Sequence, residues 1–337
     1  MSNCTFDLRY EASEPPGSRL DAHPIKEPMK TLTLRDFADS FGTGEEDLSA
    51  ACAALVENGD FRYRDITGVE RDELILKVLM RIDADTQTIG AFERREAWNK
   101  GWQENLQEYI NSGYDRHKLV PKFIRLGQPV RFRQSYIEPH NPGFELAFIE
   151  VFRRWFFEKY LREFSCVYEF GCGTGFNLVA LAEMFPDKML FGLDFVPSAV
   201  ELVTRIGETQ GIRLTGRLFD MVTPDYTLEI KSDSAVFTFG AIEQLAGRFD
   251  AFLDYLLMKK PALCAHIEPT VELYDQNNLV DHLAIKFHRK RGYTEGLLPR
   301  IQKLASRNLA ELIKVKRLFF GSLYMEGYSL IVWRPRR

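Results

Sequence analysis

Hydrophobic and polar positions follow two different rhythms along the chain, and the change comes after the first third. In that third, apolar residues recur at helical spacing, as where Leu48, Cys52 and Leu55 share one face of a segment. Residues 31–140 are therefore predicted to be mainly helical. They follow residues 1–30, which are rich in Pro, Ser and Glu and are predicted to form a loose arm.

The rest of the chain alternates short apolar runs with helical stretches. A helix is predicted to start at Asn141–Pro142, because asparagine caps a first turn and proline lacks only an N–H that has no partner there. Strands are predicted at 166–170, 189–194, 213–219, 234–239 and 262–268, and helices at 176–185, 197–209 and 247–258. Such alternation requires a parallel sheet with right-handed crossovers.

The end of the chain departs from this alternation. The β-rich runs "ELIKVKRLFF" and "GYSLIVWRP" are separated by only about six residues, too few for a crossover helix. They are predicted to form an antiparallel hairpin. The stretch before them, about 270–308, is predicted to be an insertion. The expected fold class is α/β, with a mostly parallel sheet and an antiparallel C-terminal hairpin in a domain at 141–337.

Composition and charge change this picture little. The chain has 337 residues, of which 45% are hydrophobic and 27% charged, ordinary values for a globular protein. A formal charge of −4 disfavours a protein that coats nucleic acid. Five scattered cysteines without a C-x-x-C pair indicate reduced thiols. Since no secretory leader and no membrane-spanning run is visible, a cytoplasmic protein without membrane partners is expected.

The first predicted strand leads into a glycine-rich turn, "VYEFGCGTGFN" at 167–177. No Lys follows the glycines as a P-loop requires, and Gly175 comes one place too early for a dinucleotide fingerprint. The pattern E-x-G-x-G-x-G resembles the nucleotide-binding motif of class I S-adenosylmethionine-dependent methyltransferases. This resemblance covers about residues 142–337, and it implies a Rossmann-like sheet and S-adenosylmethionine as cofactor. A turn without ligand is the alternative, and Cys172 is interpreted as a packing residue rather than a nucleophile.

The resemblance also implies cofactor-binding roles at the carboxyl ends of the strands. Asp194 would accept from the ribose hydroxyls, and Asp220 would face the adenine amino group with Met221 beside the ring. Ligands in such sheets bind where the strand order reverses, so Gly171 and Gly240 are expected to lie close together. The implied cofactor-binding residues are Glu169, Gly171, Cys172, Gly173, Gly175, Asn177, Asp194, Phe195, Asp220, Met221 and Gly240.

Residues that act on a methyl acceptor are expected after the fourth and fifth strands. Methyl transfer is an in-line displacement, so the protein mainly aligns the acceptor and, where needed, removes a proton. Glu243, His266 and Glu268 are the catalytic candidates. His266 and Glu268 are two apart on a strand and share a face, as a base and its orienting partner would. A hydrogen-bonded core histidine is the alternative for His266. No metal is expected, because no spacing matches a ligand signature.

The segment "PVRFRQSYIEPHNPGFE" alternates basic and aromatic residues before the methyltransferase-like half. If extended, it would place Arg131 and Arg133 on one face. This segment and the helical region are predicted either to cap the pocket and select the acceptor, or to form a homodimer surface. The candidate substrate-binding residues are Arg133, Tyr136, His140, Gln244 and Glu272.

Three functions are compatible with these residues. The preferred one is methylation of oxygen, nitrogen or carbon in a small polar metabolite, sugar-like or amino-acid-like, of secondary or surface-glycan metabolism. Methylation of RNA, DNA or protein is disfavoured by the net acidity and by "FGAI" standing where an N/D-P-P-Y/F segment would follow the fourth strand. A non-catalytic cofactor-binding scaffold is the third.

Overall fold

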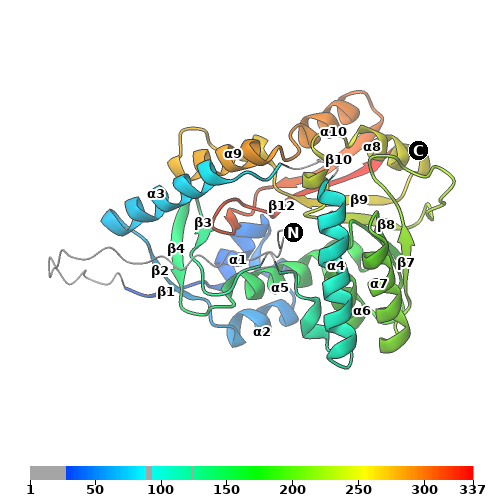
Figure 1. The fold of residues 1–337 in the computed structure, drawn as a ribbon, viewed down its shortest axis with the longest axis horizontal. Helices are drawn as coiled ribbons and strands as arrows, with labels where there is room; N and C mark the ends of the chain where they lie inside the picture. Colours follow the sequence, from blue (N-terminus) through cyan, green and yellow to red (C-terminus); the bar gives the residue numbers. More distant parts are fainter. Residues whose placement is uncertain (1–27, 89–92, 123, 337) are drawn as a thin grey trace.

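The chain contains two sheets in the part that the computed structural model describes, residues 28–88, 93–122 and 124–336. The larger sheet and its helices lie on the right of Figure 1, and the smaller sheet lies on the left. Most of the predicted arm at 1–30 falls outside the described residues. Within them, no helix combines the length and the hydropathy needed to cross a bilayer.

The larger sheet has seven strands in the order β10-β12-β9-β8-β5-β6-β7. Their bounds are β5 Cys166–Phe170, β6 Met189–Asp194, β7 Leu214–Leu218, β8 Ala235–Phe239, β9 Leu263–Glu268, β10 Ala310–Lys316 and β12 Ser329–Pro335. Strand β5 pairs in parallel with both β6 and β8, so the strand order reverses at this point. Strand β12 is antiparallel to both β9 and β10. The five predicted strands and the antiparallel hairpin are confirmed.

Helices cover both faces of this sheet (Figure 1). Their bounds are α5 Phe144–Phe156, continued by a π-turn Phe157–Leu161, then α6 Phe176–Met184, α7 Pro197–Gln210, α8 Asp250–Lys259 and α10 Leu297–Ser306. Helix α9 Leu279–Arg291 instead packs against a helix of the first third, residues 68–84. Helices α9 and α10 lie within the stretch at about 270–308 that was predicted to be an insertion. Two 3₁₀ turns of the later part of the chain, Ile242–Leu245 and Val271–Leu273, follow β8 and β9. The predicted start of α5 is wrong by two residues: the side chain of Asn141 accepts from the N–H of Gly143 (2.8 Å), and the helix begins at Phe144 rather than at Pro142.

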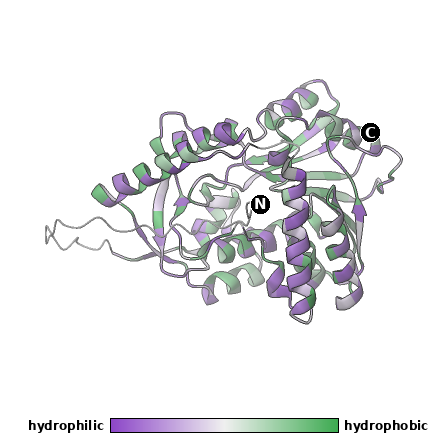
Figure 2. Ribbon diagram, in the orientation of Figure 1, coloured by the Kyte–Doolittle hydropathy of each residue, from purple (hydrophilic) through white to green (hydrophobic). Residues whose placement is uncertain are grey.

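The core between α5 and the sheet is strongly aromatic. The ring centroids of Phe152 and Phe239 lie 6.4 Å apart, and those of Phe156 and Phe237 lie 6.1 Å apart. The apolar stripe that predicted α5 is therefore the face that the helix buries against β8. This packing places the first turn of α5 among the residues of the site described below. Figure 2 shows the hydrophobic colour concentrated in the sheet and in the core-facing helices.

The first third of the chain is mainly helical, as predicted. It contains α1 Leu34–Phe41, α2 Ala50–Asn58, α3 Gly68–Ala84 and α4 Glu93–Asn111, with 3₁₀ turns at Glu45–Asp47 and Arg116–Leu119. It also contains four strands that the sequence did not predict, β1 Lys30–Thr31, β2 Arg62–Asp65, β3 Val130–Phe132 and β4 Ser135–Pro139. Strands of two to five residues are too short to show a reliable alternation.

The smaller sheet has the order β1-β2-β4-β3-β11, where β11 is Phe320–Gly321. Because β11 lies in the connection between β10 and β12, this sheet draws on both sides of the predicted boundary at residue 141. Strands β3 and β4 are joined by Arg133 and Gln134, whose φ angles are 48° and 62°, as a tight two-residue hairpin requires. The extended conformation assumed for Arg131 and Arg133 is therefore wrong. Arg131 is fully buried, whereas Arg133 is exposed on the turn.

Candidate active site

Three glycines form the turn between β5 and α6. Gly171, Gly173 and Gly175 have φ angles of 73°, 51° and 72°, in the left-handed region that favours glycine. A Cβ on Gly171 would lie 2.3 Å from the Cβ of Ala241, the second residue after β8. The turn therefore approaches the segment after β8 as closely as backbone allows, which confirms the proximity predicted at the reversal of strand order.

Asp194, the last residue of β6, holds the turn in place. Its Oδ2 accepts from the N–H of Gly173 (3.0 Å), and its Oδ1 accepts from the N–H of Val196 (3.0 Å). Burial raises the pKa of Asp194 to about 6, although these backbone bonds oppose the rise. The carboxylate is thus ionised at neutral pH and keeps lone pairs for a ligand, since each oxygen can accept twice.

Glu169 lies deeper, on β5. Its Oε1 accepts from Nδ2 of Asn177 (2.8 Å), whereas its Oε2 is buried and has no hydrogen-bond partner among the described residues. Burial raises the pKa of Glu169 to about 8. Nearby, the guanidinium of Arg153 stacks on Phe176 at 3.9 Å and lies 3.5 Å from Oδ1 of Asn177. The end of β5 therefore presents one unused carboxyl oxygen beside a buried cation.

Helix α4 crosses the opposite side of the turn, in front of the larger sheet in Figure 1. Arg95 forms an ion pair with Asp220, and its guanidinium lies 5.1 Å from the ring centroid of Phe195. The indole of Trp102 lies 3.1 Å from the position that a Cβ on Gly173 would occupy. The sequence did not predict this placement, because α4 is predominantly hydrophilic (Figure 2). Its one signal was a pair of tryptophans, Trp98 and Trp102, spaced four apart.

The remaining contacts of α4 fix it to α7. The hydroxyls of Tyr109 and Thr209 are 3.1 Å apart, and Ser198 donates to the backbone carbonyl of Asn99 (3.0 Å). Tyr109 is fully buried. These contacts anchor α4 at Asn99 and near its C-terminal end, while its first turn, which carries Arg95, lies over the predicted adenine-binding residues.

The catalytic roles predicted for His266 and Glu268 need correction. Both side chains contact the hydroxyl of Thr238, so they share a face as predicted. Trp333 donates to Nε2 of His266 (2.9 Å), and burial lowers the pKa of His266 to about 3. The carboxylate of Glu268 accepts from the backbone N–H groups of Ala241 (3.1 Å) and Glu243 (3.2 Å). Both residues are engaged within the protein, which matches the core alternative for His266.

Glu243 and Gln244 lie on the 3₁₀ turn after β8, at the predicted edge. Nε2 of Gln244 donates to Oε1 of Glu243 (2.6 Å), and Oε1 of Gln244 is buried without a hydrogen-bond partner in the described chain. Gly240 precedes them with a φ of 63°, and a Cβ on it would meet no atom within 4 Å. This edge therefore combines open space at Gly240 with the unsatisfied amide oxygen of Gln244.

The other candidate substrate-binding residues are not brought together. Each makes a separate contact away from the glycine turn: Arg133 pairs with Asp36 (2.7 Å), Tyr136 donates to the carbonyl of Leu323 (3.2 Å), Nδ1 of His140 lies 2.7 Å from Asp60, and Glu272 accepts from the N–H of Gly296. Tyr136 is buried, and the other three are exposed. They lie apart because Arg133 is on the turn between β3 and β4, Tyr136 and His140 are on and just after β4, and Glu272 is on the 3₁₀ turn after β9. The cap and the dimer surface both stay predictions.

The strand order identifies the fold. Strands β6 and β7 continue the parallel sheet beyond β5, β9 continues it beyond β8, and β12 is inserted antiparallel to both neighbours between β9 and the edge strand β10. The chain has the class I methyltransferase fold.

The position of Cys172 agrees with its interpretation as a packing residue, because its Sγ lies within the core, 3.0 Å from the position that a Cβ on Gly192 would occupy.

The chain was compared with known proteins and structures. It matches no family model and no curated protein sequence. Among solved structures, N,N-8-amino-8-demethyl-D-riboflavin dimethyltransferase from Streptomyces davawensis is 13% identical over 90% of this chain and 89% of its own, with a TM-score of 0.40. The [4+2]-cyclase SpnF is 10% identical over 57% and 82%, with a TM-score of 0.43. An O-methyltransferase from neocarzinostatin biosynthesis is 12% identical over 57% and 58%, with a TM-score of 0.37, so this chain spans less than two thirds of that enzyme.

A pair that the sequence did not single out lies at the same edge of the sheet. The hydroxyl of Tyr328 donates to Oε1 of Glu145 (2.8 Å), and each residue is only 7% exposed. Burial raises the pKa of Glu145 to about 7. In the sequence, Glu145 looks like an ordinary carboxylate in the first turn of a helix, and its partner lies 183 residues away.

Proposed function

We propose that this protein transfers a methyl group from S-adenosylmethionine to oxygen, nitrogen or carbon of a small polar metabolite, sugar-like or amino-acid-like. The supporting observation is the turn of three left-handed glycines held by Asp194 at the reversal of strand order. Open α/β sheets bind ligands in the crevice at this point. The buried and unused Oε2 of Glu169 is a second feature that a ligand with N–H donors would satisfy.

The residues at this edge fit the parts of the cofactor. Glu169 would accept from its ammonium group, and Asp194 from its ribose hydroxyls. Asp220 would accept from the adenine amino group, with Phe195 and Met221 beside the ring. When bound, the cofactor supplies a methyl group already activated by the sulfonium charge. The protein's own task is then to align the acceptor and to take its proton.

For the cofactor to bind in this way, the side chain of Arg95 must first give up its contacts with Asp220 and Phe195. The carboxylate of Asp220 is paired with Arg95, and the guanidinium of Arg95 covers Phe195. An adenine that bonds Asp220 and packs on Phe195 would take both of these places. The side chain of Arg95 is 54% exposed, so it can turn into solvent without leaving a buried charge unpaired.

Calorimetry with S-adenosylhomocysteine tests this proposal. The folded wild-type protein should give a binding heat, and Asp194→Asn should weaken binding by at least about tenfold, since the amide removes one acceptor from the ribose and from the turn. Asp187→Asn, at an exposed position just before β6, is the matched control and should bind as the wild type does. Absence of heat from well-folded wild-type protein would refute the proposal.

An assay of methyl transfer distinguishes a small-molecule acceptor from a macromolecular acceptor and from a non-catalytic scaffold. Cell extract divided into small molecules, RNA and protein is incubated with the enzyme and methyl-labelled cofactor. The proposal expects label in the small-molecule fraction. Label in RNA or protein would instead identify a macromolecular acceptor. Binding of S-adenosylhomocysteine without label in any fraction would favour a non-catalytic scaffold.

A further inference from the structure

Tyr328 lies at the carboxyl ends of the parallel strands. It directly precedes Ser329, which opens β12 and pairs with Glu268, the last residue of β9. Its ring centroid is 5.8 Å from that of Phe239, the last residue of β8. The hydrogen bond from Tyr328 therefore holds Glu145 at the edge where the acceptor is expected.

Two further charged groups lie near Tyr328, one on the turn after β8 and one on α5. Tyr328 interacts electrostatically with Glu243, on the turn after β8, and with Arg153, on α5. Arg153 in turn lies next to Asn177, the partner of Glu169 on β5. The pair thus lies between the residues after β8 and the buried polar group at the glycine turn.

The contacts of Glu145 with the other described residues do not account for its burial. Among the described residues it forms no ion pair, and its hydrogen bond comes from a neutral hydroxyl. Glu268, by contrast, uses both oxygens to bind backbone N–H groups. A buried carboxyl without a cation reduces stability, and such groups concentrate at functional sites.

We propose that Glu145 is the proton acceptor of this site and that the methyl acceptor is an amine, which binds as its ammonium ion. This inference rests on the proposed methyl-transfer function and narrows it to nitrogen. The carboxylates of Glu145 and Glu243 both act on the hydroxyl of Tyr328, against the single guanidinium of Arg153, so a cationic acceptor is favoured over a neutral hydroxyl. A base that titrates near neutral pH is also suited to take a proton from an ammonium ion.

The step balances without a further reactant. The ammonium group gives one proton to the free oxygen of Glu145, and the nitrogen lone pair then forms the bond to the methyl carbon. The carbon–sulfur bond breaks, and its electron pair stays on sulfur. Glu145 afterwards releases the proton to water.

Tyr328 acts as a positioning residue. Burial, together with the charges of Glu145 and Glu243, holds the pKa of Tyr328 well above its ordinary value, so the hydroxyl stays a donor. Its hydrogen bond favours the ionised form of Glu145 and opposes the effect of burial. It also occupies one carboxylate oxygen and leaves the other for the acceptor.

The test uses two cofactor analogues and does not require the acceptor. Sinefungin carries an amine where the methyl-sulfonium group would be, whereas S-adenosylhomocysteine has no group there. Calorimetry should show that the wild type prefers sinefungin, and this preference should grow from pH 6 to pH 8 as Glu145 ionises around its pKa of about 7. Glu145→Gln should reduce the preference by about tenfold or more, while affinity for S-adenosylhomocysteine changes less than about twofold.

Two further variants control this measurement. Glu150→Gln, at an exposed position on the same helix, should keep both the preference and its pH dependence. Tyr328→Phe removes the hydrogen bond that favours the ionised carboxylate, so the pH midpoint of the preference should move upward. A purely structural contact would not move this midpoint.

The possible failures can be told apart. If the folded wild type binds neither analogue, the proposed function fails and this inference fails with it. If both analogues bind but Glu145→Gln leaves the preference and its pH dependence intact, Glu145 is not the proton acceptor, although the cofactor site stands. If Glu145→Gln melts like the wild type but loses S-adenosylhomocysteine, the residue holds the cofactor, and the inference is likewise overturned.

Discussion

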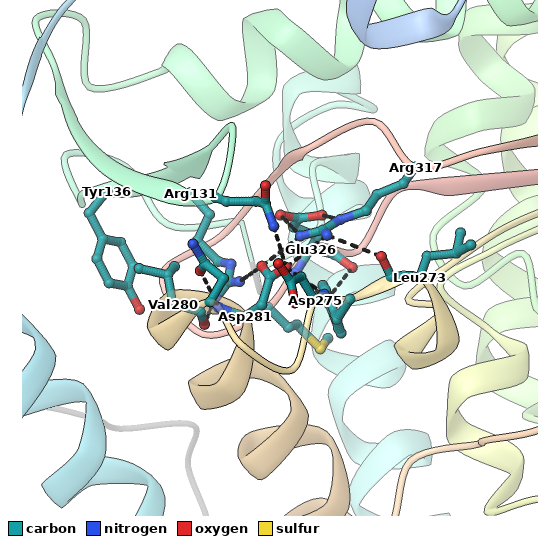
Figure 3. Close-up of polar contacts among 12 residues, drawn as sticks. Arg131, Tyr136, Leu273, Asp275, Val280, Asp281, Arg317 and Glu326 are labelled. Carbon is teal, nitrogen blue, oxygen red and sulfur yellow. Dashed lines mark hydrogen bonds and ion pairs between the residues drawn. The ribbon is translucent and has the colours of Figure 1, made fainter.

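Replacing Asp281 by asparagine should destabilise the protein strongly, because this carboxylate joins the two sheets. Figure 3 shows Arg131 and Arg317 approaching Asp281 from two sides. Nη2 of Arg131 lies 3.0 Å from Oδ1, and Nη1 and Nη2 of Arg317 lie 2.8 and 2.6 Å from its two oxygens. Gln134 and the N–H of Asp275 donate to Oδ2 as well. Strand β3, helix α9 and the segment after β10 thus meet at one buried side chain.

The expected loss follows from burial. Asp281 and Arg131 are fully buried, and Arg317 is 6% exposed. Removing one partner from a buried ion pair costs about 3–5 kcal/mol, because the remaining charge is left unpaired. In Asp281→Asn, Arg317 keeps Glu326 (2.7 Å), whereas Arg131 keeps the carbonyl of Val280 (2.8 Å) but pairs with no other carboxylate among the described residues. The loss should therefore fall within this range.

Urea unfolding followed by circular dichroism measures the effect. The matched control is Glu311→Gln, which breaks a half-exposed bond to Arg334 (2.8 Å) and should cost about 1 kcal/mol or less. An Asp281→Asn variant that unfolds at the same urea concentration as the control would refute the reasoning.

The same network predicts a dependence on pH. Burial alone would raise the pKa of Asp281, but hydrogen bonds from Arg317, Asp275 and Gln134 outweigh it and lower the pKa below its ordinary value. A depressed carboxyl pKa adds stability above the unfolded pKa of about 3.9, and this stability is lost as the pH falls through the folded value. The difference between the wild type and Asp281→Asn should therefore shrink below about pH 4.

Two further predictions concern the glycine turn and its cover. Arg95→Ala should bind S-adenosylhomocysteine a few-fold more tightly, because the side chain no longer competes for Asp220; weaker binding in calorimetry would mean that Arg95 helps to hold the nucleoside. Gly171→Ala should lose binding and melt at a lower temperature, since its Cβ would meet that of Ala241 at 2.3 Å with a φ of 73°. Gly247→Ala has a similar φ of 78° and open space, so it isolates the cost of the contact, and equal losses in both variants would contradict this explanation.

Central strands of the larger sheet such as β5 and β8 could be predicted because each is a largely apolar run bounded by polar or turn residues. Strands β5 and β6 match their predicted bounds, since both are almost wholly buried and followed by a local turn. The smaller sheet could not be predicted in this way. Strand β11 has two residues and forms only because Phe320 meets Phe132 of β3, a long-range contact that leaves no local pattern.

The residues of the candidate site likewise fall into those with a local sequence signal and those without one. The glycine turn and Asp194 are recognisable because a left-handed turn after a strand needs glycine at each position, and the acid ends the next strand. The role of His266 was not recognisable. A histidine on a strand has the same local pattern whether it faces a ligand or, as here, a tryptophan of β12.

The amino-acid order by itself determined the parallel sheet, its antiparallel edge and the turn that would receive the cofactor, because periodicity and turn chemistry act between residues close in the chain. The tertiary structure alone decided which charges meet. Arg95 and Asp220 are 125 residues apart, and Glu145 and Tyr328 are 183 apart. Such contacts depend on how α4 and α5 pack on the sheet, and packing energy is shared among many side chains that no short segment contains.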